Sequence, residues 1–332
     1  MIIDTETLKK ALDYLSMGIA KSRDKYETQL IEFETSNGRL KAYTSDDVNK
    51  LGIRICDTTD TLNVTLKFDM LYSLVKACKD NQIGIKAAKN YAEFITNTVS
   101  CRLSTFSHSI SKPQFPKYTG SMNSEIIKEY MPIIKSMIDT SHVVECYRYI
   151  YFGDNIMATD TDNVAIIDES IFNNMLMQLH SLEILSSFDD FEYILDGNTF
   201  CACSGGKIVE ISLMDKSKYQ YTDLMELFNN AAKNTISLSK DILSNAISTA
   251  SLFAPDTVEL VFDDNGARIE IPNDNFKYVL SSNKCASKTY EVTLNLLKRF
   301  LVIGTDLTIG YDEDTLISVN DGKIKTIFGV DG

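Results

Sequence analysis

Apolar and polar positions near the start of the chain follow two different periods. Residues 5–20 carry one apolar stripe at the spacing of an amphipathic helix, and a short apolar pair at residues 2–3 precedes them. The stripe is Leu8, Leu12, Leu15 and Ile19. The segments TQLIEFE and GRLKAYT then alternate with period two around Ser36-Asn37-Gly38, a hairpin signal, and KLGIRI follows. The pattern predicts a strand, a helix and three strands.

This unit recurs six times along the chain, which makes it a repeat architecture. The later helices are predicted at residues 68–80, 124–138, 170–185 and 294–302, with another that begins after Ser239 as its cap. Two units form one domain, and a proline-bearing connector at residues 112–116 separates the first domain from the second. We therefore expect an α+β protein with three domains, at residues 1–122, 123–235 and 236–332.

Each expected domain is a duplicated β-α-β-β-β unit, with its two helices on the same side of its sheets. Three such domains in a row form a quasi-repetitive object that can close on itself. Rings arise when head-to-tail contacts between subunits close. The repeat pattern is therefore compatible with a ring whose sheets lie outside and whose helices line the hole, although periodicity alone does not establish closure.

Composition places the chain among globular proteins of the cell interior. Its 332 residues are 44% hydrophobic and 24% charged. No stretch approaches the roughly 18 unbroken apolar residues of a membrane helix, and MIIDTETLKK lacks the regions of a signal peptide. We expect a cytoplasmic protein that does not bind membranes.

Candidate catalytic and metal-binding residues all have simpler structural interpretations. The seven cysteines show no CxxC spacing, and the three histidines are far apart, so no zinc motif exists. Asp46 and Asp47 recur as Asp160 and Asp162 at the same point of the repeat, which favours turn capping over a magnesium site. No GxSxG string or phosphate-binding loop is present. We expect no enzyme, no metal and no cofactor.

Several local strings, in this order of elements, resemble the bacterial-type DNA sliding clamp, the DNA polymerase III beta subunit family. The strings are Ala158-Thr159-Asp160 with Val164-Ala165, Phe115-Pro116-Lys117-Tyr118, and Leu103-Ser104-Thr105. The family has Gly-His-Arg where this chain has Thr161-Asp162-Asn163, and the second linker, Tyr219-Gln220-Tyr221, lacks proline. These differences indicate a divergent or phage-encoded member.

The resemblance implies a processivity factor: a ring of three-domain subunits that encircles duplex DNA without sequence preference and tethers a replicative polymerase. A net charge of -13 argues against a DNA-coating protein unless the helix faces are basic. Several basic residues do fall on or beside the expected helices, and Arg23 and Lys67 match basic positions of the family. The expected DNA-binding residues are Lys9, Lys10, Arg23, Lys67, Lys76, Lys128, Lys135, Lys240, Lys298 and Arg299.

The resemblance also implies two protein interfaces, a head-to-tail homodimer and a groove for peptides of the polymerase and the clamp loader. In the dimer, Cys101 and Leu103 would face Leu252 and Phe253 of a second copy. The expected groove residues are Thr159, Val164, Leu224, Met225, Ile327, Phe328 and Val330. The alternative is an acidic DNA mimic, or another interaction protein without a ring, and the lysines on the helices count against it.

Overall fold

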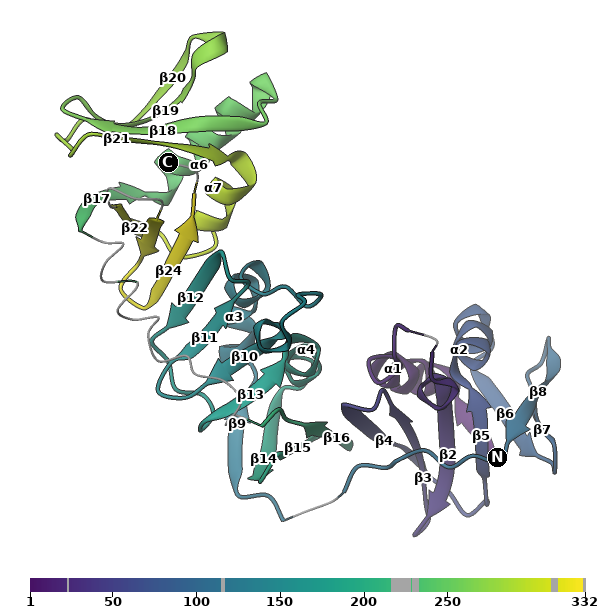
Figure 1. Ribbon diagram of the computed structural model, residues 1–332. Helices are drawn as coiled ribbons and strands as arrows, with labels where there is room; N and C mark the ends of the chain where they lie inside the picture. The colour runs from purple at the N-terminus through teal and green to yellow at the C-terminus, as the bar shows by residue number, and fades with distance from the viewer. Residues whose placement is uncertain (23, 115–116, 216–227, 229–232, 312–315, 331–332) are drawn as a thin grey trace. The chain divides into compact units, whose positions relative to one another are not determined.

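The computed structural model describes residues 1–22, 24–114, 117–215, 228, 233–311 and 316–330. Short helices and antiparallel strands give the chain an α+β fold, as predicted. The chain divides into two compact units, the first made of Met1–Glu125 and His180–Leu213, the second of Ile126–Leu179 and Met214–Gly332. Each unit therefore combines one end of the chain with part of its middle third (Figure 1).

The first unit is built on a 12-stranded sheet of order β1-β6-β7-β8-β5-β2-β3-β4-β16-β15-β14-β9. Its strands are β1 Ile2–Asp4, β2 Leu30–Ser36, β3 Arg39–Ser45, β4 Asn49–Asp57, β5 Asn63–Lys67, β6 Gln82–Ala87, β7 Tyr91–Ile95, β8 Ser100–Phe106, β9 Gly120–Asn123, β14 Asp190–Asp196, β15 Thr199–Ser204 and β16 Lys207–Ser212. The pairing of β4 with β16 joins segments that are far apart in sequence.

Three α-helices accompany this sheet: α1 Thr5–Ser16, α2 Phe68–Ala77 and α4 Leu179–Ser186, together with the 3-10 turn η1 Tyr26–Gln29. Helix α1 begins after Asp4, whose carboxylate accepts a 2.7 Å hydrogen bond from the Thr7 amide, an ordinary N-cap. Its predicted stripe is buried as far as Leu15, and α1 packs against α2 (Figure 1). The apolar spacing therefore places the helix on the sheet through one face.

The second unit holds an 8-stranded sheet, β13-β10-β11-β12-β24-β23-β22-β17, and a 4-stranded sheet, β20-β19-β18-β21. The strands are β10 Tyr149–Phe152, β11 Ile156–Thr159, β12 Asn163–Ile167, β13 Met175–Gln178, β17 Asn234–Ser239, β18 Thr257–Asp263, β19 Gly266–Ile271, β20 Phe276–Ser281, β21 Lys288–Thr293, β22 Asp306–Tyr311, β23 Leu316–Asn320 and β24 Ile324–Gly329. Here β12 pairs with β24, which again joins distant segments.

The helices of this unit whose bounds the structure describes are α3 Glu125–Ser136, α6 Lys240–Ala250 and α7 Leu294–Phe300, with 3-10 turns η2 Glu145–Arg148, η4 Ser251–Phe253 and η5 Pro272–Asp274. The predicted cap is confirmed, because the Ser239 hydroxyl accepts a hydrogen bond from the Ile242 amide. Thr293 caps α7 in the same way through the Leu296 amide. Helices α6 and α7 pack against each other (Figure 1).

The predicted helix at residues 170–185 is wrong over its first half. Residues Met175–Gln178 form strand β13, which pairs with β10, and α4 begins only at Leu179. Met175, Leu176 and Met177 are all buried, and a short continuous apolar run cannot be assigned to helix or strand by periodicity alone. With β13 before α4, this copy of the repeat also has a strand before its helix, as the other copies do.

The other helices are shorter than predicted by a few residues at their ends, as in α1, where the predicted helix reached residue 20 and the observed one ends at Ser16. Ile19 lies beyond that end and is half-buried. In the part of the chain that the structure describes, no helix is both long and apolar enough to cross a membrane.

Candidate functional site

Two turns of the repeat share one hydrogen-bonding arrangement. Between β3 and β4 the Asp46 carboxylate accepts from the Asn49 amide and side chain, and between β11 and β12 the Asp160 carboxylate does the same for Asn163. The residue after each aspartate has a positive φ, 76° at Asp47 and 83° at Thr161. The aspartates therefore cap turns, as the repetition predicts.

Each turn leads into a strand that pairs across a long sequence gap, and we call these pairings the first strand junction (β4 with β16) and the second strand junction (β12 with β24). In the first, Lys50 lies opposite Glu210 and the two side chains form an ion pair. Glu210 is only 6% exposed and also accepts a 2.7 Å hydrogen bond from the Gln114 amide. This junction is closed by polar contacts within the chain.

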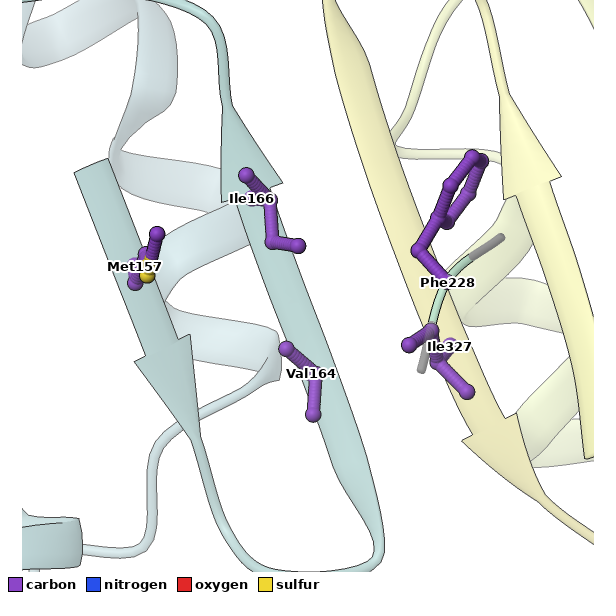
Figure 2. Close-up of a cluster of buried hydrophobic side chains, with 5 residues drawn as sticks. All are labelled: Met157, Val164, Ile166, Phe228 and Ile327. Atoms are coloured by element: carbon purple, nitrogen blue, oxygen red, sulfur yellow. The ribbon is translucent and has the colours of Figure 1, made fainter. Parts of the chain in front are cut away.

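The second strand junction places apolar residues at the same register. Counted from the asparagine that starts each strand, Lys50 corresponds to Val164 and Glu210 to Ile327, and these two residues are cross-strand partners. They belong to a buried apolar cluster of Met157, Val164, Ile166, Phe228 and Ile327 (Figure 2), with the partly buried Tyr151 and Leu316 packed against it. We call this set the apolar cluster.

The predicted groove residues divide between two faces of the sheet. Thr159 is the cross-strand partner of Val164, so both point to the face of the apolar cluster. Phe328 follows Ile327 along β24 and points to the opposite face, where it is fully buried against the ring of Phe300 at 4.7 Å between centroids. The Phe328 side chain therefore does not lie on the same surface as Val164, contrary to the prediction.

The remaining predicted groove residues add less to the apolar cluster. Val330 is half-buried beyond the end of β24. Leu224 and Met225 lie outside the described residues. Phe228, from the same connection, takes the place next to Ile327 (Figure 2). Its spacing of four residues from Leu224 is a helical signal that the sequence offered.

A polar cavity of about 250 Å³ lies beside the second strand junction, and we call it the junction pocket. Its lining includes Asp162, Asn163, Glu291, Asn295, Arg299 and Val330. The Arg299 guanidinium lies 3.5 Å from the Asp160 carboxylate, so this predicted DNA-binding residue is already paired. The sequence did not predict the pocket, because its walls come from three separate segments of the chain.

The predicted DNA-binding lysines lie on the described helices or beside them, and several are paired with acids. Lys9 is 2.9 Å from Glu6, and Lys76 is 2.7 Å from Asp13, whose carboxylate raises the pKa of Lys76. Lys10, Lys128, Lys135 and Lys298 are exposed, whereas Lys67 and Lys240 are half-buried. Arg23 lies outside the described residues.

Acids nearly cancel the basic charge of the described helices. The acidic residues are Glu6, Asp13, Asp69, Glu125, Glu129, Glu183 and Asp241. The basic residues are Lys9, Lys10, Lys76, Lys128, Lys135, Lys240, Lys298 and Arg299. Since the whole chain carries -13, the acidic excess lies on strands and connections.

The residues predicted for the dimer interface differ in exposure. Leu252 is 82% exposed and Phe253 is 45% exposed, where η4 follows α6. Cys101 is half-buried and Leu103 is buried on β8, whose residues 100–104 pair only with β7 among the described strands. The second unit thus presents apolar side chains, and the first presents a strand edge.

The described histidine, cysteine and acidic side chains were compared with the requirements of a metal site and of a reactive thiol. Among them no three His, Cys, Asp or Glu residues lie close enough to hold a metal ion. The six described cysteine side chains are free thiols, and burial, followed by the charge of Glu210, raises the pKa of the Cys201 thiol to about 11. A thiol with such a pKa is unreactive at neutral pH.

No protein-family model and no curated protein matches the sequence. Solved structures do match over the full length. A Helicobacter pylori beta clamp bound to a DNA ligase peptide is 18% identical, with a TM-score of 0.81, and the alignment covers 100% of this chain and 99% of that one. The DNA polymerase III beta chain of Streptococcus pneumoniae is 12% identical, with a TM-score of 0.84 and coverage of 99% and 98%.

The DNA polymerase sliding clamp of Bacillus subtilis is 14% identical, with a TM-score of 0.83 and coverage of 99% and 98%. The chain therefore has the fold of the bacterial beta clamps. At these identities the likeness concerns the fold, and the side chains of each site have to be judged on this chain's own residues.

Proposed function

We propose that this chain is a DNA polymerase processivity factor of the sliding-clamp type, a non-enzymatic cytoplasmic protein of the replication machinery. The observation that carries the proposal is the likeness to bacterial beta clamps along the entire length of both chains. A partial match would support only a shared domain. A full-length match supports the same number and order of domains, namely 1–122, 123–235 and 236–332.

The proposed assembly is a head-to-tail homodimer that closes into a ring. Leu252 and Phe253 provide apolar side chains that water would otherwise surround, and the open edge of β8 provides backbone groups for a partner strand. Phe253 packs against Phe276, the first residue of the edge strand β20, with 5.1 Å between ring centroids. An apolar patch beside one strand edge suits a contact with another strand edge.

Duplex DNA is the proposed ligand of the helix faces. The described helices are nearly neutral while the chain is strongly acidic, so DNA is repelled least at the helices. Contacts from Lys10, Lys128 and Lys298 to phosphates carry no sequence information, and they permit sliding. An acidic DNA mimic would instead carry its excess acid on the helix faces, so the charge distribution favours the clamp.

The proposed partner site is the apolar cluster at the second strand junction. A peptide of a polymerase or a clamp loader would pack an apolar anchor on its partly exposed rim, Tyr151 and Leu316, next to Phe228. The Helicobacter pylori clamp named above binds a DNA ligase peptide, which supports a peptide site in this fold. The first strand junction lacks such a surface because Lys50 and Glu210 occupy it.

The test is retention on nicked circular DNA after loading, combined with light scattering. We expect a dimer at micromolar concentration, and about tenfold weaker dimerisation after Leu252→Ala with Phe253→Ala, because interface anchors of this kind carry most of the binding energy. Val143→Ala is the control, since Val143 is 91% exposed in the same unit. A monomer that is not retained on DNA would refute the proposal.

The same assay tests the DNA contacts. Lys10→Ala and Lys298→Ala should each reduce the salt slope of retention by about one unit without any sequence preference. Lys284→Ala is the control, because Lys284 pairs with Asp264 and both residues lie on connections between strands, outside the described helices. Unchanged slopes for both helix variants would exclude these two lysines from the DNA-contacting face.

A further inference from the structure

Three polar side chains of helices α1 and α2 form one cluster, Asp13, Tyr72 and Lys76, which we call the helix triad. The Tyr72 hydroxyl donates a 2.9 Å hydrogen bond to Asp13 Oδ1, and Lys76 Nζ lies 2.7 Å from Oδ1 and 2.9 Å from Oδ2. Lys76 Nζ also lies 5.4 Å from the centroid of the Tyr72 ring. One carboxylate of α1 therefore holds two side chains of the neighbouring helix.

Both ions of the helix triad remain charged at neutral pH. Burial by itself would raise the pKa of Asp13, but the hydrogen bonds from Lys76 and Tyr72 outweigh it and lower the pKa below its usual value. The hydrogen bond with Asp13 raises the pKa of Lys76. The lysine is thus a cation whose charge is already compensated within the chain.

The helix triad lies at the surface and contributes little to the stability of the fold. The side chains of Asp13 and Lys76 are 46% and 41% exposed, and water and salt screen an ion pair of this kind. Each helix is anchored by buried apolar residues of its own, among them Leu12 of α1 and Val75 of α2. The main consequence of the Asp13 carboxylate is therefore its effect on the charge that the helices present to a ligand.

Other basic residues of the helices differ from Lys76 in how they are paired. Lys9 pairs with Glu6 of its own helix, so no second helix takes part. Lys298 is exposed on α7, and among the described residues it has no ion-pair partner. Lys298 can meet a phosphate with its full charge, whereas Lys76 must first leave Asp13.

We propose that Asp13 competes with DNA phosphates for Lys76 and so limits how strongly the helix face holds DNA, an inference that rests on the proposed function. A phosphate that binds Lys76 displaces the Asp13 carboxylate and leaves it unpaired beside another negative charge. The contact therefore adds little affinity. Asp13 acts through Lys76 as a positioning residue, and a weak hold suits a protein that slides along the DNA backbone.

The test measures the binding of the full-length protein to a short fluorescein-labelled duplex by anisotropy over a salt series. Asp13→Asn keeps an oxygen for the Tyr72 hydroxyl but frees Lys76. We expect binding about eightfold tighter at about 0.1 M salt and a salt slope steeper by about one unit, as for one added phosphate contact. Circular dichroism establishes that the variant is folded.

Asp241→Asn is the matched control for the lost negative charge. Asp241 is an exposed aspartate of α6 that has no ion-pair partner among the described residues, so its replacement removes a carboxylate without freeing a lysine. The affinity of this variant should rise by less than about twofold, and its salt slope should stay the same.

A second substitution tests whether Asp13 acts through Lys76. In the wild-type chain Lys76→Gln should weaken DNA binding by less than about twofold, because the lysine is already paired. In the Asp13→Asn background the same change should weaken binding about eightfold and restore the original salt slope. A purely structural role for Asp13 would alter the melting temperature and leave no such difference between the two backgrounds.

Three results would overturn the inference and leave the proposed function standing. They are a salt slope of Asp13→Asn no steeper than that of Asp241→Asn, an equal effect of Lys76→Gln in both backgrounds, and no binding of the duplex by Asp13→Asn at any salt concentration. If the wild-type chain also fails to bind the duplex, is monomeric and is not retained on circular DNA, the proposed function fails as well.

Discussion

Lys50 lies opposite Glu210 at the first strand junction, and Val164 lies opposite Ile327 at the same register of the second. Both strands follow an Asp-to-Asn turn with a positive φ after the aspartate. The backbone is therefore repeated, while the side chains differ in kind. The ion pair satisfies its own charges inside the chain, whereas the apolar pair leaves a surface whose rim another molecule can cover.

The largest loss of stability should follow from placing the charged residues of the first strand junction at the second. Ile327→Glu should lower the free energy of unfolding by about 4 kcal/mol, because Ile327 is 1% exposed and a lone carboxylate is buried there. Adding Val164→Lys should recover part of the loss through the cross-strand pair. Urea denaturation measures both variants.

The double variant also separates folding from partner binding. If it folds but no longer stimulates a polymerase, the apolar character of the second strand junction is what partners require. Full stimulation by the folded double variant would place the partner site elsewhere.

The reverse exchange should have a somewhat smaller effect. Glu210→Ala leaves the Lys50 ammonium and the Gln114 amide without their partner. It should lower the free energy of unfolding, measured by urea denaturation, by about 3 kcal/mol. Lys50→Val with Glu210→Ile installs the pair of the second junction and should be near neutral, because well-packed apolar residues often replace a buried ion pair without loss. A double variant as unstable as Glu210→Ala would show that the ion pair itself stabilises the junction.

Substitutions in the turns before the two strands should change the stability by smaller amounts. Thr161 holds φ at 83° with a β-branched side chain, a strained conformation that glycine adopts freely. Thr161→Gly should raise the free energy of unfolding by about 1 kcal/mol. Asp47→Gly should gain less, because aspartate tolerates this region better and the Asp47 carboxylate also pairs with Lys25 at 2.6 Å. Calorimetry of both variants checks the order.

The smallest expected effect concerns Cys201, the cross-strand neighbour of Glu210. Burial and then the Glu210 carboxylate raise its thiol pKa from 9.0 to about 11. The associated stability is complete below pH 9 and is lost as the pH rises through about 11, because the unfolded thiol ionises first. Iodoacetamide labelling of the native protein at pH 8 should be about a hundredfold slower than in urea.

Glu210→Gln sharpens this last measurement. Removing the negative charge should move the labelling profile of Cys201 down by a fraction of a pH unit, since burial remains the larger cause. At the second strand junction the residue opposite Ile327 is Ser318, so no thiol there reports on the exchange. An unchanged profile would mean that Glu210 does not act on Cys201.

Local sequence pattern determined the hairpins, the capping aspartates and the helices other than α4, because each depends on residues that are neighbours along the chain. The stripe of α1, the Ser239 cap and the duplicated Asp46 and Asp160 turns were all predictable in this way. The resemblance of short strings added the clamp fold. It succeeded because those strings occur at the expected places in a repeated architecture.

Tertiary structure alone decided which strands pair across long gaps, and therefore which side chains meet. No local pattern places Lys50 beside Glu210, Val164 beside Ile327, or Phe328 on the face opposite Ile327. Strand register has a period of two, so one residue of shift exchanges the buried and outward faces. The apolar cluster and the junction pocket both follow from that register, which is fixed only when distant segments pack together.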